Sequence, residues 1–236
     1  MKRGIPTTTF VSAVLAVCVA VKAETTVSVS AGASLTSAAI AYRAERIRSF
    51  EAENTSASLG GIVFIGDANM ERFPPALLDT TFTVINRAIA GETIGGAGEA
   101  GLVERIGTTV APLKPAKIFV LTGGTDLTEL QTQPDVFLAG YSKLLQELKS
   151  AAPSAQIYVQ GILPFRDAMI RHNDTVRILN TRLESLARSE QVGFVPLHHH
   201  FADPKGNLAV ELTSDGAQLN ELGYRKWAAI LKRYLK

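Results

Sequence analysis

The fold of this chain is decided by residues 61–70, which read Gly61-Ile-Val-Phe-Ile-Gly-Asp-Ala-Asn-Met70. The run 62–65 is continuously apolar and rich in β-branched residues, as is typical of a strand buried on both faces. It ends in Gly66-Asp67 and a short polar turn, the kind of loop on which an α/β enzyme presents a reactive side chain. The position where that side chain is expected holds Ala68, whose methyl group has no oxygen that can react.

Strand-like and helical stretches alternate along the rest of the chain. The expected strands are residues 62–65, 82–85, 117–121, 156–160 and 193–197. The expected helices are 98–110, 134–151, 167–190 and 220–235, preceded by an amphipathic helix at 35–53 that we expect to pack across the sheet. This alternation predicts βαβ units, and therefore a five-stranded parallel sheet covered by helices on both faces in a three-layer α/β/α fold.

The composition fits a single domain of this kind. The chain has 236 residues, of which 46% are hydrophobic and 19% charged, enough to bury one sizeable core. The formal net charge of +2 includes Lys2, Arg3 and Lys22, so a chain without its first residues is close to neutral and has no basic run. We therefore expect no nucleic acid partner.

The first 23 residues have the features of a signal peptide. A basic start is followed by an apolar stretch at 10–20 that is too short to span a bilayer, and Ala23 is a small residue suited to cleavage. We expect a signal peptide at 1–23, a flexible tether rich in Ser and Thr at 24–36 and a folded domain at 37–236. The mature protein is then secreted or periplasmic and has no membrane span. An uncleaved membrane anchor and a lipid attached at Cys18, the only cysteine, are the alternatives.

Polar segments follow the strands, at the edge where parallel sheets bind ligands. These segments are Gly66-Asp67-Ala68-Asn69, residues 86–93, Gly123-Gly-Thr-Asp126 and Asp215-Gly-Ala-Gln-Leu-Asn220. In that order and spacing they resemble the SGNH, or GDSL, hydrolase family of esterases, lipases and carbohydrate deacetylases. Residues 46–50, residues 161–164 and Asn180 are similar as well. The resemblance covers nearly all of the mature chain and implies the flavodoxin-like fold of that family.

The resemblance also implies five catalytic positions. The family places there a serine nucleophile, a glycine amide, an asparagine, an aspartate and a histidine base, and in this sequence they fall on Ala68, Gly91, Thr125, Asp215 and Gln218. An alanine cannot attack, and a carboxamide cannot shuttle a proton as imidazole does. Loss of the nucleophile or the base costs a serine hydrolase a factor of about 10⁶ in turnover. We therefore expect a catalytically inactive, hydrolase-like protein.

The binding half of such a site does not depend on these side chains. The backbone N–H groups of Ala68 and Gly91 and the hydroxyl of Thr125 can still bind a carbonyl or carboxylate oxygen. With Asp67, Asp215 and Gln218 they form the expected ligand site. We expect it to hold an acylated or acidic small molecule such as a glycan, without metal or cofactor. Asp67 and Asp126 are expected to cap turns through bonds to local backbone.

Two alternatives keep an enzyme. In the first, the chemistry has moved to His198, His199 and His200 after the fifth strand, with His172 on the loop or helix before it, and the three histidines could also form a metal site with Asp203. Consecutive residues point in different directions, which favours ordinary histidines at a strand end instead. In the second, an active esterase has been altered at three separate positions by engineering or error. The glycine-rich residues 91–98 lack the lysine of a phosphate-binding loop and are expected to border the cleft.

Overall fold

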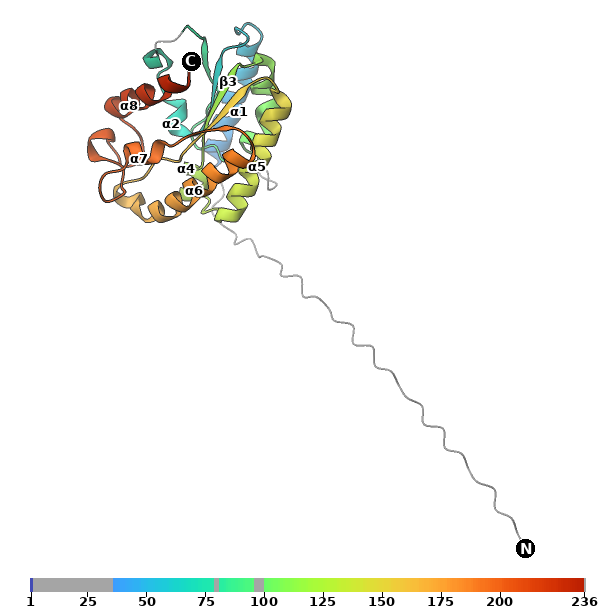
Figure 1. Ribbon diagram of the computed structural model, residues 1–236. Helices are drawn as coiled ribbons and strands as arrows, with labels where there is room; N and C mark the ends of the chain where they lie inside the picture. Colours follow the sequence, from blue (N-terminus) through green and yellow to red (C-terminus); the bar gives the residue numbers. More distant parts are fainter. Residues whose placement is uncertain (2–35, 79–80, 96–99, 236) are drawn as a thin grey trace. The chain divides into compact units, whose positions relative to one another are not determined.

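The computed structural model describes residues 1, 36–78, 81–95 and 100–235, so the expected signal peptide, nearly all of the tether and Cys18 lie outside the described part of the chain. Five parallel strands form one sheet in the order β2-β1-β3-β4-β5 (Figure 1). Their bounds are β1 Ile62–Gly66, β2 Val84–Asn86, β3 Lys117–Leu121, β4 Gln156–Gln160 and β5 Gly193–Val195. This is the strand order of flavodoxin-like proteins, and the expected fold class is confirmed.

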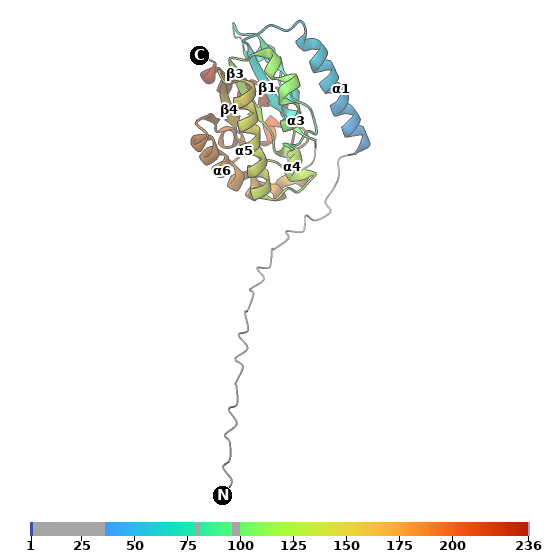
Figure 2. The same ribbon diagram turned by 90° about the vertical axis from the view of Figure 1, so that its right-hand side faces the viewer.

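Helices cover both faces of this sheet. One face carries α3 (Leu102–Thr109), α5 (Pro134–Ala151) and α6 (Asn173–Ser189), and the other carries α2 (Ala68–Glu71), α7 (Leu197–Phe201) and α8 (Glu221–Leu231). Successive strand residues alternate between the two cores, as Phe119 and Val120 of β3 do. Figure 2 shows α3, α5 and α6 together on one side.

Some element bounds differ from the expected ones. Residues 167–172 form a 3₁₀ helix, and α6 begins only at Asn173. Strand β5 ends at Val195 because Pro196 has no N–H to donate to a neighbouring strand, and α7 follows at once. A short α4 (Gly124–Thr128) follows β3. The other 3₁₀ helices are Pro75–Leu78, Ala111–Leu113, Val210–Leu212 and Lys232–Tyr234.

Helix α1 (Ser37–Asn54) packs against α3, and the expectation that it lies across the sheet is wrong. Its buried residue is Phe50, whereas Ile40 is 58% exposed. Ion pairs hold the helix in place instead: Arg43 with Glu92, Arg46 with Glu71 and Glu53 with Arg87. Apolar periodicity alone therefore does not predict where this helix packs, because it is attached mainly through polar contacts.

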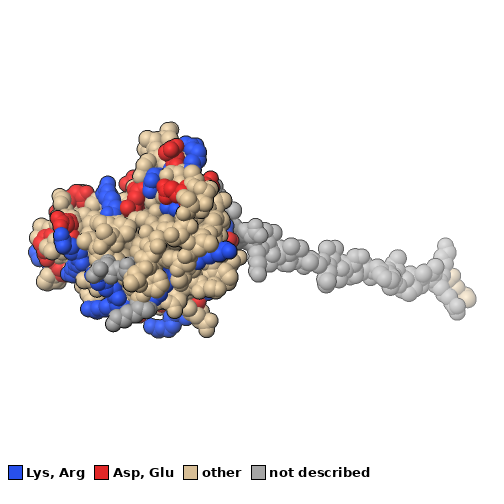
Figure 3. Space-filling view, turned by 90° about the horizontal axis from the view of Figure 1, so that it is seen from above, with Lys and Arg blue, Asp and Glu red and all other residues tan. Residues whose placement is uncertain are grey.

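Charged side chains of both signs surround the face drawn in Figure 3, and its middle is largely uncharged. Among the helices of the described residues, none is both long and apolar enough to cross a bilayer.

Candidate functional site

The site lies where the strand order reverses, at the carboxyl ends of β1 and β3. Gly66 ends β1 at φ +147°, and a Cβ at this position would lie 1.7 Å from the carbonyl oxygen of Leu121. Only glycine permits so close an approach of the two strands. The N–H of Asp67 donates to the same carbonyl at 3.0 Å, and α2 begins at the next residue, Ala68. The chain thus turns from strand to helix within two residues.

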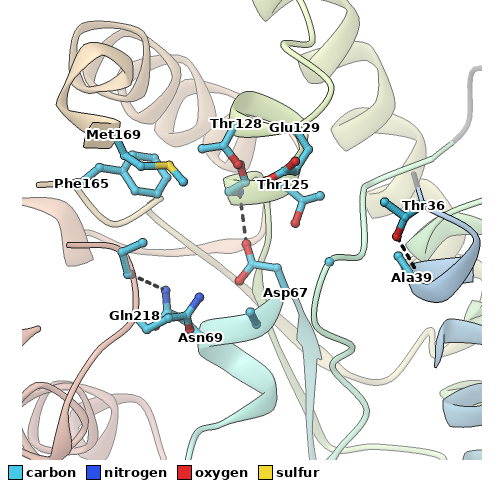
Figure 4. Close-up of a pocket in the computed structure, with 14 residues that line it drawn as sticks. Thr36, Ala39, Asp67, Asn69, Thr125, Thr128, Glu129, Phe165, Met169 and Gln218 are labelled. Carbon is cyan, nitrogen blue, oxygen red and sulfur yellow. Dashed lines mark hydrogen bonds between the residues drawn. The ribbon is translucent and has the colours of Figure 1, made fainter. Parts of the chain in front are cut away.

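A pocket of about 370 Å³ opens beside this turn (Figure 4). Five of the six expected positions line it: Asp67, Ala68, Gly91, Thr125 and Gln218. The remaining lining residues are Thr36, Ala39, Asn69, Gly124, Thr128, Glu129, Phe165, Met169 and Ala217. The expected position missing from the lining is Asp215.

The N–H groups of Ala68 and Gly91 find no hydrogen-bond acceptor among the described residues. Ala68 opens a helix, so its N–H has no partner within that helix. Gly91 adopts φ +75°, and a Cβ there would meet nothing within 4 Å. Two backbone donors on different loops are therefore available to a ligand in the pocket.

Asp215 shapes the loop rather than the pocket. Its Oδ1 accepts hydrogen bonds from the N–H groups of Ala217 (3.0 Å) and Gln218 (2.7 Å). Burial raises the pKa of the Asp215 carboxyl, but these two bonds, together with the Arg72 charge and the Thr213 hydroxyl, outweigh burial and the pKa is lowered. The Oε1 atom of Gln218 is buried and accepts no hydrogen bond from the described residues. The side chains of Asp215 and Gln218 are thus not joined to each other.

Asn69 is a positioning residue that the sequence reasoning missed. Its Nδ2 donates to the carbonyl of Ala217 at 3.1 Å, and its Oδ1 accepts from the N–H of Leu219 at 3.0 Å. The hydroxyl of Tyr224 donates to the carbonyl of Asn69 at 3.1 Å. These bonds fasten the loop that carries Gln218 to the start of α2. A polar residue directly after Ala68 was the available signal, but its partners lie about 150 residues away in sequence.

Asp67 and Asp126 join loops instead of capping their own turns alone. Asp67 accepts from the N–H of Gly124 at 3.1 Å, and Asp126 accepts from the N–H of Ile94 at 3.2 Å. Burial raises the pKa of Asp67 to about 6, although the N–H groups of Gly124 and Asn69 act against it. Burial, with the nearby Asp67 charge, raises the pKa of Asp126 to about 7. Both carboxyls thus bind backbone N–H groups, but those of Gly124 and Ile94 belong to other loops, which the expectation of local bonds did not include.

The three neighbouring histidines do not belong to this pocket. They lie on α7, and none of them lines the pocket. The rings of His199 and His200 are 3.9 Å apart, and Nε2 of His198 is buried without a hydrogen-bond partner among the described residues. The described part of the chain contains no cluster of three or more His, Cys, Asp or Glu side chains that could hold a metal.

The chemistry of the lining follows from its residue types. It contains no serine, cysteine, histidine, lysine or arginine. The hydroxyl of Thr128 donates to the carbonyl of Gly124 at 3.0 Å. Ala39, Phe165, Met169 and Ala217 supply apolar surface, and Phe165 and Met169 lie side by side in Figure 4. The pocket therefore offers hydrogen-bond donors and an apolar wall, without a nucleophile paired to a base.

Comparison with known proteins identifies one matching family and several solved structures with a similar fold. The family described as GDSL-like Lipase/Acylhydrolase matches residues 56–226. A solved Streptococcus pneumonia protein named for platelet activating factor is 26% identical, with a TM-score of 0.75 over 84% of this chain and 94% of that one. A GDSL-like lipase from Bacteroides thetaiotaomicron VPI-5482 is 20% identical, with a TM-score of 0.69 over 80% and 96% of the two chains. A carbohydrate esterase family 3 protein from Talaromyces cellulolyticus is 14% identical, with a TM-score of 0.60 over 75% and 96%. No curated protein matches the chain.

Proposed function

The chain belongs to the GDSL-like lipase/acylhydrolase family, and we propose that it is an exported member that binds an acylated or acidic ligand, such as a glycan, without hydrolysing it. One observation carries the proposal. The pocket has N–H donors at Ala68 and Gly91 without an acceptor among the described residues, but its lining contains no nucleophile paired to a base and neither residue of the family's serine–histidine pair. The site can therefore bind a ligand without hydrolysing it.

The inactivity follows from what acyl transfer requires. A hydroxyl attacks a carbonyl only when a neighbouring base takes its proton, and the base must titrate near the working pH. The resemblance puts the nucleophile at Ala68, the base at Gln218 and a side-chain donor at Thr125. A methyl group and a carboxamide meet neither requirement, so no covalent acyl intermediate can form at these positions.

The binding follows from the donors that remain. The free N–H groups of Ala68 and Gly91 suit a carbonyl oxygen, and each such hydrogen bond contributes about 0.5–1.5 kcal/mol in the ground state. The apolar side chains of Phe165 and Met169 suit the hydrocarbon part of a short acyl group. A volume of about 370 Å³ is within the usual range for small-molecule sites.

Export is part of the proposal. Residues 1–23 carry a basic start, an apolar stretch and a small residue at the end. N-terminal sequencing of the protein released from expressing cells is expected to begin at Glu24. Retention of Met1, or a lipid on Cys18, would contradict this part and leave the site proposal untouched.

Binding is tested with purified residues 24–236. Titration with N-acetylglucosamine is expected to shift the amide NMR signals of residues 68 and 91. Ala68→Leu fills the pocket and should abolish the shifts, whereas Ala38→Leu makes the same change at an exposed residue and should preserve them. Unchanged signals at both amides, for every acyl compound tried, would refute ligand binding at this site.

Inactivity is tested by restoring the family residues. The wild type is expected to hydrolyse neither short aryl esters nor acetylated sugars. The triple variant Ala68→Ser, Thr125→Asn, Gln218→His should gain esterase activity, and Ala68→Ser alone should gain far less because the base is still absent. Hydrolysis by the wild type would instead favour the alternative of an active enzyme with non-standard catalytic residues.

A further inference from the structure

The pocket carries negative charge and no positive charge of its own. Among its 14 lining residues there is no lysine, arginine or histidine, but there are two carboxyl groups, Asp67 and Glu129. Asp67 is 8% exposed and lies beside Ala68, whose N–H is one of the two free donors. Glu129 is exposed, and its N–H donates to the carbonyl of Thr125 at 2.9 Å. It therefore lies at the open edge of the pocket.

Three arginines behind the pocket form ion pairs with acids outside its lining. Arg43 pairs with Glu92 at 3.2 Å, and Arg105 donates to the same carboxylate at 2.7 Å. Arg46 pairs with Glu71 at 3.2 Å. None of these arginines lines the pocket. No arginine charge is among the interactions that shift the pKa of Asp67, whereas the Glu92 charge helps to raise that pKa.

Arg166 and Arg72 follow lining residues closely in the sequence but also lie outside the lining. Arg166 forms an ion pair with Asp203 and donates to the carbonyl of Leu208. Arg72 is exposed, lies outside the pocket lining and lowers the pKa of Asp215. Glu129 forms no ion pair with any described residue. The side chains that line the pocket therefore carry formal negative charge and no formal positive charge.

We propose that this pocket selects uncharged or positively charged acyl compounds over acyl anions, and that Glu129 is the residue that attracts a cationic substituent. The inference rests on the proposed function, because it assumes that an acyl oxygen binds at Ala68 and Gly91, and it favours the acylated over the acidic ligands named there. A carbonyl oxygen brings only a partial negative charge to these donors. A carboxylate anywhere in a bound ligand brings a full charge into a pocket lined by Asp67 and Glu129, and no lining residue supplies a cation.

The buried Asp67 is expected to affect ligand binding more strongly than the exposed Glu129. A like charge within about 4–6 Å of a buried carboxylate shifts an ionisation equilibrium by roughly 1–3 pKa units, so an anionic ligand is expected to bind at least about tenfold more weakly. Glu129 is exposed, and solvent screens its charge. Its preference for a cation is expected to be about 2–5-fold.

The test uses three ligands with one acetamido group and different charges at the other end. They are N-acetylglycine (anion), N-acetylglycinamide (neutral) and N-acetylethylenediamine (cation), titrated at pH 8 against residues 24–236. The neutral and cationic ligands are expected to bind, and the anion at least about tenfold more weakly. Glu129→Gln should weaken the cation about 2–5-fold relative to the neutral ligand, while Glu51→Gln, at an exposed residue of α1 outside the lining, should not.

Each outcome decides a separate point. If none of the three ligands binds, the proposed function fails. If the anion binds as tightly as the neutral ligand, the selectivity proposed here fails and the proposed function stands. If Glu129→Gln leaves the preference for the cation unchanged, the role of Glu129 is overturned. Repeating the titration at pH 5 should reduce the penalty on the anion, because burial raises the pKa of Asp67 to about 6 and the group is then mostly protonated.

Discussion

Two buried carboxyl groups hold together the three loops that supply the donors of the pocket. Asp67, next to Ala68, binds the N–H of Gly124 at the start of α4. Asp126, within α4, binds the N–H of Ile94 in the loop that carries Gly91. Neither group forms an ion pair with a described residue, so both retain their desolvation cost. Because Asp67 and Asp126 can titrate and also hold these loops together, the geometry of the pocket depends on the protonation states of these two residues.

The raised pKa values of these two groups predict a pH dependence of stability. A carboxyl whose pKa is higher in the folded protein binds its proton more tightly there than in the unfolded chain. Its contribution to the free energy of unfolding is complete below a pH of about 4. This contribution is lost as the pH rises through about 6 for Asp67 and about 7 for Asp126. Asp126→Asn removes the loss of stability that is due to Asp126. It keeps a side-chain oxygen that can accept a hydrogen bond from the N–H of Ile94. We expect the free energy of unfolding of this variant to fall less between pH 5 and pH 8 than that of the wild type, by about 1.4 kcal/mol for each pKa unit.

The difference between variant and wild type is the quantity to measure, by urea unfolding at several pH values. Burial lowers the pKa values of His172, His198 and His200, so they act in the opposite direction, and both proteins share them. Asp135→Asn, at an exposed residue, is the matched control and should keep the slope of the wild type. Identical slopes for Asp126→Asn and the wild type would contradict the role given to Asp126.

At the scale of elements, strands and long helices could be predicted from the sequence, and short helices could not. Strand β3 and helix α5 have the predicted bounds, because a buried strand and a long amphipathic helix each have a clear apolar period. Helices α2 and α4 span four and five residues, too few to show any period. They form because the chain must turn immediately after a strand that ends at the edge of the site.

The candidate site could be predicted only in part for a related reason. Residues directly after a strand, such as Ala68 and Thr125, lie at the carboxyl edge of the sheet wherever the loops go. Glu129, Phe165 and Met169 reach the pocket only through the course of their loops, which the local sequence does not determine. Asp215 and Gln218 lie on one turn, yet only Gln218 faces the pocket.

Helix α1 and α3 share a buried ion network, and its loss has a predictable cost. Glu92 is 2% exposed and accepts hydrogen bonds from Arg105, which is equally buried, and from Arg43 of α1. Glu92→Gln leaves Arg105 with an uncompensated buried charge. We expect a loss of about 3–5 kcal/mol in the free energy of unfolding. Denaturant unfolding at pH 7 measures it.

An exposed pair on the same helix provides the comparison. Glu45 and Arg48 form an ion pair in which both side chains are more than two thirds exposed. Glu45→Gln should cost about 0–1 kcal/mol, because solvent screens both charges. Equal losses in the free energy of unfolding for Glu92→Gln and Glu45→Gln would show that burial does not determine how much the Glu92 network stabilises the protein.

At the scale of the folded domain, one sheet separates two apolar cores that share its strands. Phe119 and Val120 are neighbours in β3, but the first side chain enters the core beneath α8 and the second the core beneath α5. Trp227, the only tryptophan, is fully buried in the core beneath α8 and donates to Oε1 of Gln160 at 2.8 Å. Its fluorescence reports on that core alone, so it can reveal whether damage to the other core is felt across the sheet.

Leu144→Ala makes this test, because Leu144 lies in α5 and is fully buried in the opposite core. The cavity should cost about 2–5 kcal/mol. If the two cores unfold together, the fluorescence of Trp227 and the far-ultraviolet circular dichroism will lose stability by the same amount and keep coincident midpoints in urea. Leu59→Ala, at a residue that is 59% exposed, should move neither midpoint appreciably. A circular dichroism midpoint that falls while that of Trp227 stays in place would mean that the cores unfold separately, because the shared strands do not couple them.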